Sequence, residues 1–355
     1  MEIQSYQKKE IMRDHSIDIA KGIAIILVLL GHISITPKGL TIWLYSFHIP
    51  LFFLCSGMVL SIEKNPSIWL FFKKKAKSLI WPYFTLGISL WLLQNIFLII
   101  HNSTFETKEV VDWNICHILL KLLLGYRLHY HYYTLWFVCV LFVGELITYV
   151  FLRYIYKGPT HAIPVIGIGL IFIQWVVFKG IKGFFWSLDL LPCGIAFLLI
   201  GYYLRIVKKE LSRIAVWYVI LALLAINIMI GAINYKAHGM VNLYSCEMGY
   251  PHWFALSAVA GSICVILICK RLKTSPVLEY FGRNSLIIYA YNNNLTIPIA
   301  KDLVSAATST SDLLKEESFQ WVLVTVIACS LSCVLVEVIT RYFPFVIAKR
   351  SVPNE

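Results

Sequence analysis

Ten apolar segments, each about 17–25 residues long, restrict what this chain can fold into. Such a stretch crosses a bilayer as an α-helix, because its backbone polar groups then bond within the segment. Hydrophobic residues make up 59% and charged residues 14% of the chain, whereas soluble domains have about 45–50% and 25%. The sequence therefore predicts an all-α, polytopic membrane helical bundle of about ten transmembrane helices, forming a single domain over residues 1–355. The predicted spans are roughly 16–35, 42–62, 79–100, 133–152, 161–179, 185–204, 214–233, 250–269, 284–300 and 319–340.

Lys and Arg are distributed unevenly between the two sides of this predicted bundle. Of the 31 such residues, 20 fall on the side of the termini and 9 on the other. Because loops rich in Lys and Arg stay inside the cell, both termini are predicted to be cytoplasmic in a multi-pass protein of the inner (plasma) membrane. The net charge of +12 then reflects this bias and attraction to anionic membrane lipids, not nucleic-acid binding.

The first span, DIAKGIAIILVLLGH at 18–32, carries a polar stripe through an apolar helix. Lys21 and His32 are eleven residues apart, which is about three whole turns, so both point to one side about 16 Å apart along the axis. Asp18 precedes Lys21 by three residues and is predicted to pair with it. Each charged group inside a span costs about 2.5–3.5 kcal/mol on insertion scales. Such a stripe therefore indicates function.

The second span runs back inward and carries His48 close to the outer surface, at about the depth of His32. The short connection at 36–41 keeps the two spans adjacent, and Pro50 can loosen the backbone beneath His48. Two imidazoles at one depth in neighbouring helices form a candidate catalytic site. Four further polar residues fall near that depth in or beside other spans: Asp189, Glu247, Asn292 and Asn293. They predict a substrate-binding cavity open to the outer face, or hydrogen bonds between helices.

The run KKKAK begins with Lys73, Lys74 and Lys75 on the predicted cytoplasmic side. It is typical of a topogenic sequence, and the alternative is that it helps to hold a phosphorylated ligand. The nine Cys residues are scattered and show no metal-binding spacing with His. They therefore predict neither a disulfide framework nor a zinc site.

The predicted outer loop at 105–131 contains apolar residues at helical spacing between 115 and 123. This pattern predicts a helix lying on the outer surface or capping the bundle. His129 and His131 follow in an aromatic-rich stretch. Alternate His residues can bind a metal, but no third ligand is evident, so an interfacial aromatic segment is favoured and no metal is predicted.

The chemistry of the stripe favours group transfer. A neutral His is a general base near physiological pH, and Lys21, deeper on the same face, can bind a phosphate of a donor from the cytoplasm. Two other functions remain open. A proton-coupled transporter of a polar or glycan-lipid substrate would also need intramembrane Asp, Lys and His, and a non-catalytic scaffold for envelope polysaccharide is the second.

The chain resembles integral-membrane acyltransferase family 3, in particular its stand-alone sugar O-acetyltransferase branch related to fucose 4-O-acetylase. The resemblance rests on RDHSIDIAKGIAIILVLLGH at 13–32, where Lys21 and His32 match the family's basic residue and His, and on SFHIPLFFLCSG at 46–57. Weaker similarities are LWFVCVLF at 135–142, LDLLPCGIAFLLIGYYL at 188–204 and FGRNSLIIYAYNN at 281–293. Asn292 stands where the family often has His, which leaves the role of that position and the acceptor open.

The resemblance implies transfer of an acetyl (acyl) group from acyl-coenzyme A to a hydroxyl of a carbohydrate. It implies that His32 is catalytic, that His48 takes the place of the second-span His, and that Lys21 contacts the donor. Acetyl-CoA is then the co-substrate, and a cell-envelope carbohydrate or lipid-linked glycan is the acceptor. The sequence does not indicate the oligomeric state.

Overall fold

The computed structural model describes residues 14–125, 135–181, 183–308 and 317–348. Over these residues the chain is all-helical, with no strand and only an isolated bridge between Asn242 and Glu247. The α-helices are α1 (His15–His32), α2 (Lys38–Tyr45), α3 (His48–Val59), α4 (Ile68–Lys75), α5 (Trp81–Phe105), α6 (Ile115–Leu124), α7 (Trp136–Val150), α8 (Ile163–Val177), α9 (Leu191–Ile206), α10 (Lys208–Arg213), α11 (Trp217–His238), α12 (Pro251–Leu272), α13 (Pro276–Arg283), α14 (Ser285–Tyr291), α15 (Ile297–Thr308) and α16 (Glu317–Tyr342).

Nine helical stretches within the described residues are long and apolar enough to cross a membrane, so the protein is a polytopic helical membrane protein. The predicted span at 284–300 is not among them. There, helix α14 passes through the π-helical turn η6 (Asn292–Thr296) into α15, so one interrupted helix runs from Ser285 to Thr308. The three consecutive Asn residues of η6 lower its hydropathy, while the helix remains long enough to connect the two ends of the bundle.

Contacts between distant segments show which helix ends lie at the same end of the bundle. The beginning of α1 and the end of α16 lie at one end. The contacts that connect the segments there are Phe345–Trp81, Lys75–Glu145, Tyr149–Asn65, Arg205–Glu63, Lys208–Asp14 and His15–Glu279. The opposite end is linked through Lys301–Ser34, His101–Asp302, Trp91–Asp112, Trp186–Leu123 and Gln174–Asp189. The first and last described helices therefore reach the same end of the bundle, the end that the distribution of Lys and Arg predicts to be cytoplasmic.

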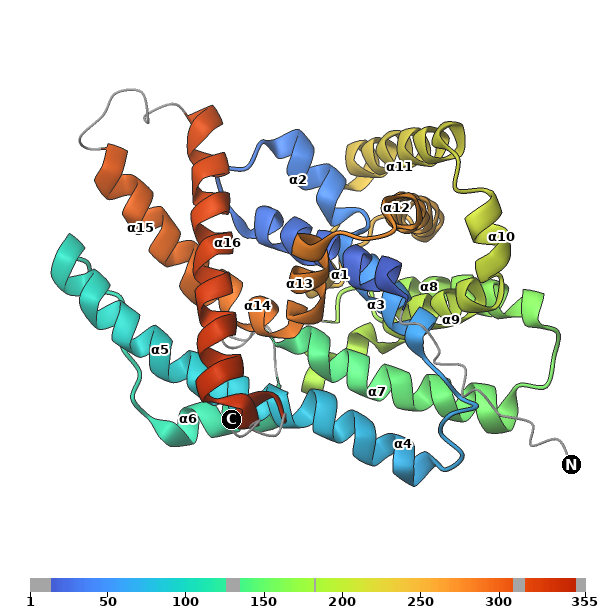
Figure 1. Ribbon diagram of the computed structural model, residues 1–355, viewed down its shortest axis with the longest axis horizontal. Helices are drawn as coiled ribbons and strands as arrows, with labels where there is room; N and C mark the ends of the chain where they lie inside the picture. Colours follow the sequence, from blue (N-terminus) through green and yellow to red (C-terminus); the bar gives the residue numbers. More distant parts are fainter. Residues whose placement is uncertain (1–13, 126–134, 182, 309–316, 349–355) are drawn as a thin grey trace, which may run out of the picture.

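Helix α1 lies in the middle of the bundle and contacts α3, α12, α13 and α14 (Figure 1). Glycine allows its neighbours to cross closely: a Cβ atom on Gly22 would overlap the Leu278 carbonyl of α13, and one on Gly57 of α3 would overlap the Leu198 carbonyl of α9. Small residues at crossings let helix backbones approach where lipid supplies no hydrophobic drive for packing. This close packing holds α1 and α3, which carry the two candidate His residues, in fixed positions.

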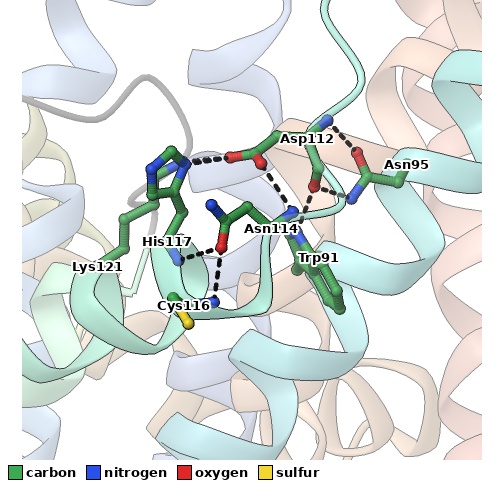
Figure 2. Close-up of polar contacts among 7 residues, drawn as sticks. All are labelled: Trp91, Asn95, Asp112, Asn114, Cys116, His117 and Lys121. Atoms are coloured by element: carbon green, nitrogen blue, oxygen red, sulfur yellow. Dashed lines mark hydrogen bonds and ion pairs between the residues drawn. The ribbon is translucent and has the colours of Figure 1, made fainter.

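The outer loop forms the predicted short helix, α6, and Figure 2 shows how it is anchored to α5. The main-chain carbonyl of Asp112 accepts hydrogen bonds from Trp91 Nε1 and Asn95 Nδ2, both at 2.8 Å. The Asp112 carboxylate caps the loop by accepting from the Asn114 main chain at 3.0 Å, and His117 and Lys121 lie at 3.3 and 3.5 Å. Those partners, the Asn114 N–H foremost, outweigh burial and lower the pKa of Asp112. These polar groups satisfy one another, so the cluster is structural.

Candidate active site

A cavity of about 160 Å³ lies between α1, α3, α7 and α14, with one wall from the π-helical turn η1 (Ala76–Ile80). Most of its lining is apolar. Four polar residues also face it: Lys21, Ser56, Ser285 and Tyr289. An apolar cavity with a few convergent polar groups is the usual form of a small-molecule site.

The cavity follows the face of α1 that carries the sequence stripe. Lys21 and Val28 both line it, seven residues apart, and are therefore about 10 Å apart along the helix axis. His32 is one turn beyond Val28 on that face. Within the described residues, the His32 imidazole forms no hydrogen bond or ion pair. His32 thus stands one helical turn past the cavity, with both ring nitrogens free of protein partners in that part of the chain.

His48 is buried and held by one hydrogen bond. Its Nδ1 lies 2.6 Å from the Leu44 carbonyl oxygen, which can only accept, so Nδ1 carries a proton and, in the neutral tautomer, Nε2 keeps the lone pair. This bond is possible because the helix breaks between α2 and α3 at Ser46 and Phe47. The break at this point turns the Leu44 carbonyl toward the imidazole.

Helices α1 and α3, which carry the two His residues, are in contact. Phe52, one turn along α3 from His48, lines the cavity. Tyr45 packs edge-on against His48 at 5.0 Å and donates a hydrogen bond to the Gly31 carbonyl at 3.2 Å. Tyr45 therefore ties the end of α1 to the start of α3 beside both His residues.

Lys21 reaches the cavity, but the predicted pairing with Asp18 is wrong. Asp18 instead lies 3.5 Å from Arg283 Nε, and Lys21 forms no ion pair within 4 Å in the part of the chain that the structure describes. The physical reason is the close crossing of α13, where Gly282 packs against the Asp18 backbone and brings Arg283 beside the carboxylate. The Lys21 ammonium is consequently available to a ligand.

The basic run is divided between two roles. Lys75 does not serve as a free cation for a ligand: its Nζ lies 2.7 Å from Glu145 Oε2 of α7, a buried carboxylate that needs a positive partner. The structure therefore corrects the prediction for Lys75. Lys73 and Lys74 are exposed and do not line the cavity.

The four other predicted substrate residues do not line the cavity either. Asp189 is buried at the outer end of α9, where the Cys246 thiol donates to its Oδ2 at 3.1 Å, and Glu247 is exposed beside it. Asn292 is buried in η6 without a hydrogen-bond partner for its Nδ2 among the described residues. Asn293 Nδ2 donates to Asn294 Oδ1 at 3.2 Å. The structure thus separates these residues into two groups, one beside the start of α9 and one in η6.

Sequence reasoning missed Ser56, Ser285 and Tyr289 as cavity residues. A signal was present: Ser56 follows His48 by eight residues, which places it about 80° around α3, within the width of one helix face. Ser285 and Tyr289 are four residues apart in the stretch FGRNSLIIYAYNN and share a face of α14. His129 and His131 lie outside the described residues. No group of three or more His, Cys, Asp or Glu in the described part of the chain is arranged to hold a metal ion.

A family model described as an acyltransferase domain matches residues 14–340, nearly the whole chain. No curated protein and no solved structure matches.

Proposed function

The chain belongs to the acyltransferase family whose model spans residues 14–340, and from that premise we propose that it transfers an acetyl group from acetyl-CoA to a carbohydrate hydroxyl. The acceptor in this proposal is a cell-envelope glycan, free or lipid-linked, and the enzyme works in the inner (plasma) membrane. Membership of the family and the helical bundle make the protein a membrane acyltransferase; the donor and the acceptor are the proposed part.

One observation carries the proposal: Lys21, which forms no ion pair with a described residue, lines one end of the cavity, and His32 stands one turn beyond its other end on the same face of α1. Lys21 and His32 are eleven residues apart on α1, or about 16 Å along its axis. Only an extended donor could touch both residues at once. A thioester arm threaded along Val28 and Phe52 would place its carbonyl near the imidazoles while an anionic group stays near Lys21.

The fixed tautomer of His48 gives the two His residues different roles. Nε2 of neutral His48 is a hydrogen-bond acceptor, because Nδ1 donates to Leu44. If one N–H of His32 donates to it, the other His32 nitrogen is left as the base. That nitrogen takes the proton of the acceptor hydroxyl as its oxygen attacks the thioester carbonyl. The carbon–sulfur bond then breaks, and the coenzyme A thiolate leaves and takes that proton from His32, which restores the base.

The test uses purified protein in liposomes with acetyl-labelled acetyl-CoA and envelope glycans. His32→Ala is expected to abolish transfer, His48→Ala to reduce kcat, and Lys21→Met to raise the KM for acetyl-CoA. The matched controls are His161→Ala and Lys179→Gln, which remove the same side-chain types at exposed positions outside the cavity. Full transfer by His32→Ala would refute the mechanism, and glycan flux without consumption of acetyl-CoA would indicate the transporter instead.

A further inference from the structure

A second concave surface lies on the outside of the bundle, at the end that also contains the start of α1. It is an open groove of about 720 Å³ between the start of α5 and the short 3₁₀-helix η8 (Pro344–Ile347). Its walls include Ile80, Trp81, Phe84 and Phe345, and Lys77 lies at its edge. The groove is separate from the catalytic cavity, because Leu79 of η1 faces the cavity while Lys77 and Ile80 face the groove.

The wall that η8 forms is fixed to α5 by two hydrogen bonds. Trp81 Nε1 donates to the Phe345 carbonyl at 2.7 Å, and Thr85 Oγ1 donates to the Val346 carbonyl at 2.6 Å. Trp81 and Phe345 nevertheless remain more than half exposed, at 51% and 57%. The groove is therefore a formed surface with large aromatic side chains on its rim, and Trp at this level is typical of the membrane–water interface.

Charge beside the groove is uncompensated and positive. Of the four lysines at 73–77, Lys75 is neutralised by Glu145 and Lys73 lies 4.9 Å over the Trp69 ring. Lys74 and Lys77 are exposed and form no ion pair within 4 Å among the residues whose placement is described. Among the described residues, no acidic side chain lines the groove. An apolar groove with a cationic edge matches an amphiphile with acyl chains and an anionic headgroup.

We propose that this groove binds an anionic phospholipid of the cytoplasmic leaflet, with an acyl chain along Ile80, Phe84 and Phe345 and its phosphate beside Lys77 and Lys74. The charge bias assigns this end of the bundle to the cytoplasm, where the leaflet carries anionic lipids that attract basic segments. Each lysine near such a surface strengthens binding about fivefold. This site does not depend on the proposed transfer reaction.

The test is native mass spectrometry of the purified full chain with phosphatidylglycerol or phosphatidylcholine of identical acyl chains. The wild type is expected to bind phosphatidylglycerol more tightly. Lys77→Gln is expected to weaken that binding about fivefold and the double variant with Lys74→Gln about twenty-five-fold, with phosphatidylcholine unaffected. Lys179→Gln, which removes a lysine at the opposite end, should change nothing.

Ala76→Phe provides a second test, because it adds a ring inside the groove. It should weaken binding of both lipids while the helix content stays that of the wild type. Equal affinity of the wild type for the two lipids would overturn the proposal. So would a double lysine variant that keeps full affinity, occupation of the groove by a second copy of the chain, or a lysine effect confined to the KM for acetyl-CoA.

Discussion

Replacing Gly261 of α12 by Ala tests whether the bend before His48 is held by close packing. An added Cβ atom would lie 2.7 Å from Phe47 Cγ and 2.8 Å from Asn227 Nδ2. Phe47 and Asn227 are both fully buried, so neither side chain can swing into open space. Because carbon contacts shorter than 3.4 Å are rare, the Phe47 ring would have to move by about 0.7 Å, together with the backbone next to His48.

The magnitude follows from three terms. Overpacking of this kind costs about 1–3 kcal/mol. Weakening one hydrogen bond of Asn227, which bonds to Trp43, Ser46 and Ser257, adds about 1 kcal/mol. Alanine in place of glycine stabilises a helix by about 1 kcal/mol, which offsets part of that loss. The free energy of unfolding should therefore fall by about 1–3 kcal/mol, and kcat should fall with it because Leu44 and His48 lose their alignment.

Thermal unfolding in detergent and acetyl transfer in liposomes are the two assays. Gly169→Ala of α8 is the matched control, because a Cβ atom there meets nothing within 4 Å and the substitution should leave stability equal or slightly higher. If Gly261→Ala were as stable and as active as Gly169→Ala, close packing would not be what positions the bend before His48.

Three further predictions concern charge and polarity. Lys75→Ala should lower the free energy of unfolding by about 3 kcal/mol or more, because Glu145 is left buried and unpaired, and adding Glu145→Gln should restore part of it in thermal unfolding. The hydrogen bond to His15 lowers the pKa of Glu279 from its ordinary 4.5. The contribution of Glu279 to the free energy of unfolding should therefore be fully present above pH 4.5 and be lost as the pH falls through the lowered pKa of the folded state. Urea unfolding at a series of pH values should show a flatter pH profile for Glu279→Gln. Asn292→Leu should keep wild-type thermal stability yet lower transfer, whereas lost stability with normal transfer would show a purely structural amide.

The crossings of the membrane could be predicted from the sequence because hydropathy over about 20 residues is a local property. The facing of Lys21 and His32 could be predicted for the same reason, since helix phase depends only on spacing. The interruption at Asn292 was visible as three polar residues, but the continuation of that helix to Thr308 was not, because its outer part contains Lys301 and Asp302 and is less apolar.

Partners contributed by other helices could not be predicted in this way. Asp18 has Lys21 three residues away, yet Arg283 is its neighbour in space because two glycines allow α1 and α13 to cross closely. Lys75 reads as one more cation in a basic run, and only its contact with Glu145 of α7 shows that it is neutralised. Spacing within a segment gives the face of a side chain, while its partner depends on how segments pack.

Those packing partners change the chemistry that the stripe can perform. Lys21 is available to a ligand because Asp18 lies beside Arg283. The proton of His48 is held on Nδ1 because the break between α2 and α3 turns the Leu44 carbonyl toward the ring. A transport route would need polar groups that pass a proton from one end of the bundle to the other. The helices that face α1 across the cavity contribute only three polar side chains to its wall, those of Ser56, Ser285 and Tyr289. The rest of that wall is apolar. That distribution favours the proposed transfer reaction, in which an extended donor is held at its charged end near Lys21 and attacked at its other end.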